Sequence, residues 1–122
     1  MQADEHHISV TRTARYYVLG TPAAHVADLW IVCHGFGQLA RDFIKSFDAI
    51  ASPQRVIVAP EALNRYYSDT APHAHGPDSP VAATWMTRED RDHEINDYVS
   101  YLDSLSTHMK TTMPDARITA LG

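Results

Sequence analysis

The chain has 122 residues, of which 44% are hydrophobic and 20% are charged, with 10 Lys and Arg against 15 Asp and Glu. This length and composition fit one globular domain and exclude a disordered chain or a two-domain protein. The net charge of −5 provides no electrostatic attraction to nucleic acid or to anionic lipid.

The N-terminus predicts no targeting segment. MQADEHHISV lacks the basic start and the apolar stretch of a signal peptide. The longest apolar run, around Leu29–Cys33, is far shorter than the roughly 20 residues of a membrane span. Cys33 is the single cysteine, which excludes an internal disulfide and agrees with a reducing compartment. We therefore expect a cytoplasmic protein without a transmembrane segment.

The first predicted elements lie in HHISVTRTARYYVLG, which alternates loosely and is rich in β-branched and aromatic residues. This pattern predicts two strands, Ile8–Thr11 and Arg15–Leu19, paired as an N-terminal β-hairpin. After a connecting loop, Leu29–Cys33 forms a continuous apolar run, as expected for a strand that is buried on both faces. A helix follows, because its apolar residues recur on one helical stripe: Leu39, Phe43, Ile44, Phe47 and Ile50.

A second buried strand is predicted at Arg55–Pro60, where the proline ends it. The next segment, Glu61–Trp85, contains three prolines and shows neither a helical nor an alternating period. A loop of this length inside a compact domain is usually functional or disordered. We expect an irregular loop that shapes a binding site.

The longest helix is predicted in TREDRDHEINDYVSYLDSLSTHM, where Thr87 and Asp90 form a capping signature. Its apolar stripe consists of Ile95, Tyr98, Val99, Leu102, Leu105 and Met109. Pro114 closes the helical region, and RITALG at the end of the sequence is a third apolar, β-branched strand. Strands that alternate with helices predict an α/β fold, with a mostly parallel sheet and helices on both faces.

The third strand ends at Gly122, although a strand of such a sheet needs a following segment that covers it. We therefore expect residues 1–122 to be the N-terminal half of a single domain. The sequence leaves three origins open: a truncation, a cleaved fragment, or a sequence that is interrupted at a chemically modified residue near a nucleophile.

The His-Gly-Phe-Gly turn after Leu29–Cys33 lies where open α/β sheets bind their ligands, at the carboxyl end of a strand. Glycines there allow the backbone to bend tightly or to approach a ligand closely. With VCHGFGQ, three further motifs follow in order: VIVAPEAL, TWMTREDR and ITALG. Together they resemble the phospholipase/carboxylesterase (acyl-protein-thioesterase-like) family of serine esterases, which have the α/β-hydrolase fold. The resemblance covers about Tyr16 to Gly122.

This resemblance implies an enzyme that hydrolyses carboxylic esters through an acyl-enzyme. By match, the backbone N–H of Phe36 is one donor of the oxyanion hole, and Gly35 and Gly37 let the backbone present it. Gly122 resembles the first glycine of the G-x-S-x-G nucleophile elbow. The serine and the other triad members would then lie beyond Gly122, and residues 1–122 alone would be inactive.

The resemblance also makes Trp85 and Met86 candidate walls of the acyl pocket, although they could equally fill the core. Tyr66 and Tyr67 are weaker candidates on the same loop. No metal or organic cofactor is required. The expected partners are a small-molecule ester and the C-terminal half of the same domain. Nucleic acid is excluded as a partner, and homo-oligomerisation remains open.

Several other residues have plainer interpretations. His34 follows a buried strand, so a structural hydrogen bond is the better interpretation than a catalytic base. Ser68, Asp69 and His73 are close in sequence, but triads are defined by geometry. His73 and His75 lack a nearby third metal ligand and favour a solvated loop. Cys33 should be an inert, small hydrophobe.

The alternative function is non-catalytic. In it, the HGFG turn and the start of the following helix bind an anion such as phosphate.

Overall fold

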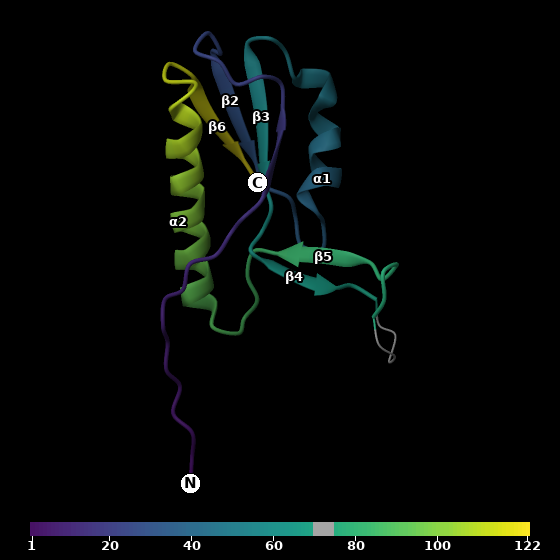
Figure 1. Cartoon of the computed structure of the whole chain (residues 1–122), viewed down its shortest axis with the longest axis vertical. Coiled ribbons are helices and arrows are strands. Elements are labelled where there is room, and N and C mark those ends of the chain that lie inside the picture. Colours follow the sequence, from purple (N-terminus) through teal and green to yellow (C-terminus); the bar gives the residue numbers. More distant parts are fainter. Residues whose placement is uncertain (70–74) are drawn as a thin grey trace.

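Two apolar runs form the central pair of a four-stranded sheet in the computed structural model, which describes residues 1–69 and 75–122. β2 (Asp28–Val32) and β3 (Arg55–Pro60) pair in parallel. β6 (Arg117–Leu121) lies parallel to β2 on its other side, and β1 (Tyr16–Leu19) runs antiparallel to β3. The order is therefore β1-β3-β2-β6, in a mixed α/β chain with a partly parallel sheet (Figure 1).

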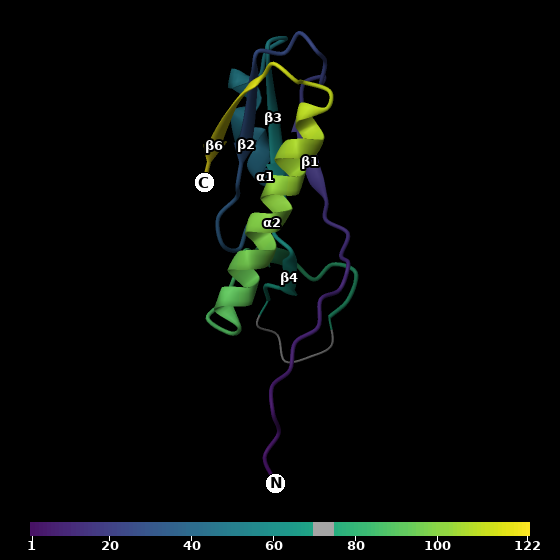
Figure 2. The ribbon, with the colours of Figure 1, turned by 90° about the vertical axis from the view of Figure 1, so that its left-hand side faces the viewer.

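Helices cover both faces of this sheet. α2 (Arg91–Lys110) lies on one face. On the other face, α1 (Ala40–Phe43) continues into the 3-10 helix η1 (Ile44–Ile50), as Figures 1 and 2 show. Among the residues that the structure describes, no helix combines the length and the apolar character that crossing a bilayer requires.

The alternation of side chains along the strands builds two cores. Leu29 and Ile31 of β2 join the cluster under α2, whereas Val32 joins the cluster under α1. The cluster under α2 contains the following buried residues: Val26, Leu29, Ile31, Val56, Val58, Leu105, Met109, Met113 and Ala116. Both faces of β2 and β3 are thus buried, which explains why their sequences are continuous apolar runs.

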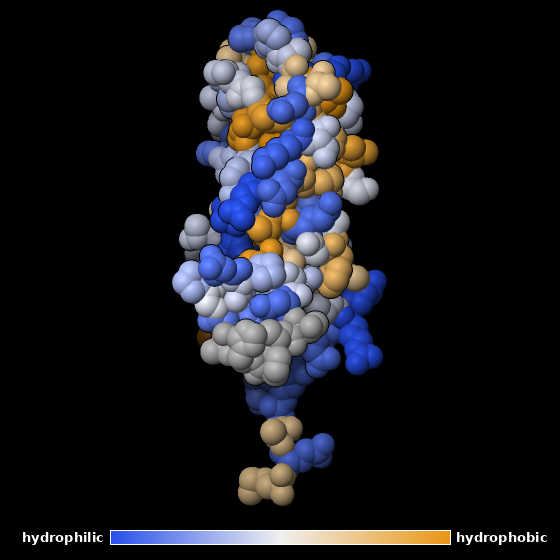
Figure 3. All heavy atoms as spheres, turned by 90° about the vertical axis from the view of Figure 1, so that its right-hand side faces the viewer, coloured by the Kyte–Doolittle hydropathy of each residue, from blue (hydrophilic) through white to orange (hydrophobic). Residues whose placement is uncertain are grey.

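The face under α1 is less completely covered. Its fully buried residues are Val32, Ala40, Ile44, Ile57 and Ala59. Seven more apolar residues of this cluster stay partly exposed: Tyr17, Leu19, Trp30, Phe43, Phe47, Ile50 and Ala51. Figure 3 shows this side, where apolar residues gather between hydrophilic ones in the upper part of the molecule.

The predicted N-terminal β-hairpin is wrong. None of residues 1–15 is in a strand, and Ile8 and Val10 are 87% and 80% exposed. Tyr16–Leu19 instead pairs with β3. An isolated two-stranded hairpin is marginal in water, whereas an edge of a larger sheet buries more of the same strand.

The segment Glu61–Trp85 is also more regular than predicted. β4 (Asn64–Tyr67) and β5 (Val81–Thr84) pair in an antiparallel two-stranded sheet at the carboxyl end of the main sheet (Figure 1). Four-residue strands that contain alanines show no clear alternation in sequence, which is why the pattern did not reveal them.

The predicted helices form with different boundaries. α2 begins at Arg91, after Asp90, so Thr87 is not its N-cap; the Thr87 hydroxyl instead accepts a hydrogen bond from the Glu89 N–H at 3.2 Å. Val99 was predicted on the buried stripe but is exposed. Tyr101, which was not predicted there, packs against the core instead. The helix after the HGFG turn is α-helical for only four residues before it tightens into η1.

Candidate active site

The His34–Gly37 turn lies at the carboxyl edge of the sheet, between two connections that diverge. The chain leaving β2 passes through this turn to α1, whereas the chain leaving β3 passes through β4 and β5 to α2 on the opposite face (Figures 1 and 2). Adjacent strands whose connections go to opposite faces leave a crevice between them, and open α/β sheets bind ligands there.

His34 is a structural anchor of this turn, as predicted. Its side chain is buried, and its Nε2 accepts a hydrogen bond from the Ala62 N–H at 3.0 Å. The ring proton therefore lies on Nδ1, which donates to the Gly35 carbonyl at 2.8 Å. With both nitrogens engaged within the fold, the imidazole joins the end of β2 to the end of β3.

The His34–Gly37 turn leaves two backbone N–H groups, those of His34 and Phe36, without a hydrogen bond to residues 1–69 or 75–122. Gly35 N–H donates to Gln38 Oε1 at 2.6 Å, Gly37 N–H to the Ala83 carbonyl at 3.1 Å, and Gln38 N–H to the Gly35 carbonyl at 3.3 Å. Of the four N–H groups from Gly35 to Gln38, only that of Phe36 donates no hydrogen bond to residues 1–69 or 75–122. Because His34 is buried and Phe36 is exposed, the Phe36 N–H is the better placed of the two to meet a ligand.

The two glycines of the turn are explained by its geometry. Gly37 has φ +81°, a left-handed conformation that favours glycine. A Cβ at Gly35 would lie 3.2 Å from Gln38 Oε1, the atom that accepts the Gly35 N–H. A side chain at either position would strain the turn and would disturb the hydrogen bonds that the Gly35 and Gly37 N–H groups donate.

Phe36 and Tyr66, both singled out in the sequence, come together. The Phe36 side chain is 75% exposed, and its ring stacks on that of Tyr66 with centroids 5.8 Å apart. Tyr67 faces the other way on β4, as strand alternation requires, and stacks on His75 at 4.1 Å. A shallow hollow of about 280 Å³ is lined by Arg65, Tyr66, Tyr67 and Val81.

Trp85 contacts the turn through a hydrogen bond to His34 and also lines a pocket. Its Nε1–H donates to the His34 carbonyl at 2.7 Å, and its ring lies 5.2 Å from the His34 ring. It packs against a small core of Leu39, Ala62 and Ala83. Trp85 also lines a pocket of about 700 Å³ between residues 7–14 and α2. Met86 is half-buried, and its carbonyl accepts the Thr84 hydroxyl at 2.9 Å.

Gly122 follows β6, and the turn follows β2, the strand that pairs with β6. The Cys33 N–H donates to the Leu121 carbonyl at 2.8 Å, and a Cβ at Gly122 would lie 3.6 Å from the Cys33 Cβ. The end of β6 and the start of the HGFG turn thus share one edge of the sheet. Burial raises the pKa of the Cys33 thiol, which favours its unreactive protonated form.

A buried carboxylate next to the turn was missed in the sequence. The Glu61 side chain is fully buried, and its Oε2 accepts the Nε–H groups of Arg15 and Arg65, each at 2.6 Å. Its Oε1 accepts Arg15 Nη2–H at 3.1 Å and the Ala40 N–H at 3.3 Å. A charged residue directly after the apolar run of β3 was the available signal, because a buried charge requires partners.

The electrostatics of Glu61 follow from these contacts. Burial acts to raise the pKa of this carboxyl, but the hydrogen bonds from Arg15 and Arg65 outweigh burial and lower the pKa. Glu61 is therefore a carboxylate at neutral pH. It joins β3 to the segment before β1, to β4 and to the start of α1.

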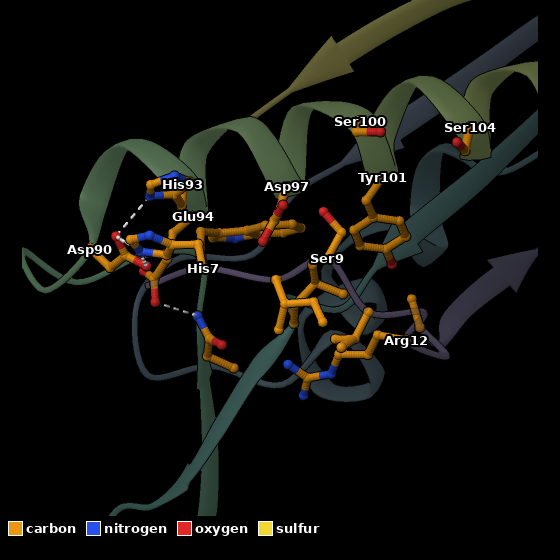
Figure 4. Close-up of a pocket in the computed structure, with 16 residues that line it drawn as sticks. His7, Ser9, Arg12, Asp90, His93, Glu94, Asp97, Ser100, Tyr101 and Ser104 are labelled. Atoms are coloured by element: carbon orange, nitrogen blue, oxygen red, sulfur yellow. Dashed lines mark hydrogen bonds and ion pairs between the residues drawn. The ribbon is translucent and has the colours of Figure 1, made fainter. Parts of the chain in front are cut away.

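A second polar cluster lies at the start of α2 (Figure 4). His7 Nε2 is 3.1 Å from both carboxylate oxygens of Asp90, and His93 Nδ1 is 2.8 Å from Asp90 Oδ1. The hydrogen bond to Asp90 raises the pKa of His93. The sequence did not predict this cluster, because His7 and Asp90 are 83 positions apart.

His73, of the sequence group Ser68, Asp69 and His73, lies outside the described residues. Asp69 pairs with His75 instead, with Oδ1 and Nδ1 2.9 Å apart.

Comparisons with models of protein families, with curated proteins and with solved structures found no match to this chain. Function must therefore be inferred from the residues and their geometry.

Proposed function

We propose that residues 1–122 are the N-terminal half of an α/β-hydrolase that cleaves carboxylic esters with a serine nucleophile, and that the Phe36 N–H is one donor of its oxyanion hole. In this reaction the serine oxygen attacks the ester carbonyl, and the alcohol leaves from the tetrahedral intermediate. Water then hydrolyses the acyl-serine and releases the acid.

The free N–H of Phe36 is the observation that carries this proposal. Gly35, Gly37 and Gln38 donate within the turn or to β5, whereas the exposed Phe36 donates its N–H to none of the described residues. A donor held in advance toward a developing oxyanion is worth about 3–4 kcal/mol of activation free energy. His34, Trp85 and Gly37 would act through the turn by holding it in place.

The position of Gly122 supports the same proposal. Because Gly122 adjoins Cys33, a serine two residues after Gly122 would enter at the edge that holds the Phe36 turn. We call the full-length protein that contains residues 1–122 the parent protein. Its sequence gives the least costly test, since the proposal requires G-x-S-x-G to begin at Gly122.

Substrate contacts would come from the aromatic residues around the turn. Phe36 and Tyr66 form an exposed stacked pair, and Trp85 faces the pocket beside α2. The chemistry needs no metal or organic cofactor. The acyl chain would lie along these side chains, while the polar ester group meets the backbone.

The alternative, an anion-binding module, has less support. Its binding group would be the start of the helix after the turn, yet α1 has only four residues. The Ala40 N–H at that start already donates to the Glu61 carboxylate.

Two substitutions at one position test the donor. Phe36→Pro removes the N–H, and Phe36→Leu is its matched control, because it changes the side chain but keeps the donor. In the parent protein we expect Phe36→Pro to lower kcat for a p-nitrophenyl ester by about 10²–10³-fold. Phe36→Leu should retain most of the activity.

Circular dichroism and a melting curve must show that both variants fold, since proline can also strain the turn. A folded Phe36→Pro protein that is as active as the parent would exclude Phe36 as the donor.

A further inference from the structure

Two imidazoles and a carboxylate from distant parts of the chain meet at one point on the surface. His7 belongs to the N-terminal arm, residues 1–14, whereas Asp90 and His93 lie at the start of α2. The available ligand atoms of these three residues all lie within 4.8 Å of one another. Figure 4 shows the three side chains turned toward each other at one end of the pocket.

The geometry points to a binding site for a divalent transition-metal ion of the zinc type, formed by His7, Asp90 and His93. Glu5 adds a negative charge beside this group, because its Oε2 lies 3.2 Å from His7 Nε2. The ion would attach the N-terminal arm to α2. This inference does not depend on the proposed hydrolase activity.

The spacing of the ligand atoms suits one ion. A tetrahedral Zn²⁺ with bonds of about 2.0–2.2 Å places its ligand atoms roughly 3.3–3.5 Å apart. His7 Nε2 and Asp90 Oδ2 are 3.1 Å apart, and His93 Nδ1 and Asp90 Oδ1 are 2.8 Å apart. Both separations are shorter than this, so the side chains would have to move apart by about 0.2–0.7 Å. The His7 and His93 rings stack with centroids 4.0 Å apart, so one ring would also have to turn before both nitrogens face one ion.

The ligand types select the class of ion. Imidazole nitrogen suits Zn²⁺, Cu²⁺, Ni²⁺ and Co²⁺, whereas Mg²⁺ and Ca²⁺ require mainly oxygen ligands. With two imidazoles among at most four ligands, the site should discriminate strongly against Mg²⁺.

The surrounding charge also favours a cation. The positive end of the α2 dipole opposes it, but this effect is weak at an exposed helix end. Carboxylates dominate the neighbourhood: Glu5, Asp90, Asp92, Glu94 and Asp97. Among the cations, Arg91 pairs with Asp92 at 3.6 Å, and Arg12 lines the same pocket.

Binding would order one wall of the 700 Å³ pocket. The arm lines this pocket with the following residues: His7, Ile8, Ser9, Val10, Arg12 and Ala14. Since none of these residues is in a strand or helix, an ion that joins His7 to α2 would hold the arm in place. A metal-bound arm should therefore resist proteolysis.

Zinc titration of the metal-free parent protein tests the site. His7→Ala and His93→Ala should each remove one Zn²⁺ site or weaken it at least about tenfold, since even indirect partners of a metal ligand contribute about 10–100-fold to affinity. His6→Ala and His108→Ala are matched controls, because they remove a histidine from the same arm and from the same helix. Both controls should bind Zn²⁺ like the parent, and Mg²⁺ should not compete.

Asp90→Asn provides a variant that preserves the fold. Asp90 has φ +53°, and asparagine also tolerates this conformation. It should fold like the parent, as checked by circular dichroism, and should bind Zn²⁺ more weakly. In the parent, Zn²⁺ should also slow cleavage of the arm by trypsin at Arg12, and His7→Ala should abolish this protection.

Two results would overturn the inference. One is a parent that binds Zn²⁺ no more tightly than His7→Ala and His93→Ala do. The other is an equal loss of affinity in His6→Ala, which would indicate adventitious binding by surface histidines.

Discussion

Replacing Glu61 by glutamine tests whether this buried carboxylate holds the carboxyl edge of the sheet together. Glutamine keeps the size and shape of the side chain but removes its charge. The carboxylate accepts four hydrogen bonds, two from Arg15, one from Arg65 and one from the Ala40 N–H. Glutamine has one acceptor oxygen, and its NH₂ group would face an arginine N–H, so about half of these bonds are lost.

The magnitude follows from the burial of the partners. A hydrogen bond to a charged group contributes about 1.5–3 kcal/mol, and breaking a fully buried ion pair costs about 3–5 kcal/mol. The Arg15 and Arg65 side chains are 43% and 37% exposed, so water can solvate them after the substitution. We therefore expect Glu61→Gln to lower the free energy of unfolding by about 2–3 kcal/mol at pH 7.

The effect should depend on pH with a definite sign. In the unfolded chain a glutamate takes up its proton near pH 4.3, but in the folded chain the two arginines lower the pKa of Glu61. The stability that the carboxylate contributes is therefore complete above about pH 5 and is lost as the pH falls through the folded pKa. The difference between parent and Glu61→Gln should shrink over that range.

Urea unfolding of the parent protein, followed by circular dichroism at pH 7 and at lower pH, measures this difference. Glu89→Gln is the matched control, because Glu89 is exposed, and it should change stability by less than about 0.5 kcal/mol. A Glu61→Gln protein as stable as Glu89→Gln, or a loss that does not vary with pH, would refute the role assigned to the carboxylate.

Substitutions at two further positions, Gly37 and Trp85, test the turn itself. Gly37→Ala should cost about 1–2 kcal/mol, because it forces alanine to φ +81°, whereas Gly76→Ala, with no atom within 4 Å of its Cβ, should be close to neutral in the same melting assay. Trp85→Phe should cost about 1 kcal/mol, since it leaves the His34 carbonyl without its donor, and Trp85→Ala about 3 kcal/mol. Trp85→Ala should also change the ratio of activities toward long and short acyl esters; an unchanged ratio would assign Trp85 to the core alone.

The central strands could be predicted because their signal is local. Arg55–Pro60 and Arg117–Leu121 match the predicted strands, and the strand predicted at Leu29–Cys33 is shifted by one residue. Burial on both faces produces a continuous apolar run that can be recognised without knowing the partner strand. The long helix α2 was also predicted from a local signal, an apolar stripe from Ile95 to Met109 that extends over about four turns.

Features that depend on distant partners could not be predicted. The strand Tyr16–Leu19 was predicted to within one residue, but its pairing with β3 was not, since nothing near it in the sequence indicates this partner. The Glu61 network and the His7–Asp90 contact likewise join residues that are 46 and 83 positions apart. The HGFG turn was located correctly from its glycines, but which of its N–H groups stays free depends on Gln38 and on β5.

The edge at β6 gives the last prediction. The sheet order ends at β6, so within the described residues one side of this strand pairs with no other strand. Ile118 and Leu121 are 40% and 47% exposed, and apolar residues are also partly exposed under α1. In the half-domain proposed above, further strands would pair beyond this position, and a helix after the elbow would cover one face.

Residues 1–122 expressed alone should therefore aggregate and should not hydrolyse esters, since an unpaired apolar edge promotes association with other chains. Ile118→Lys should make this fragment more soluble without restoring activity, because a charge on an edge strand opposes pairing but supplies no nucleophile. The parent protein should melt cooperatively and be active. Size-exclusion chromatography and a melting curve of the fragment decide the matter: a monodisperse monomer that melts cooperatively would mean that the β6 edge needs no further strand, and the half-domain proposal would fail.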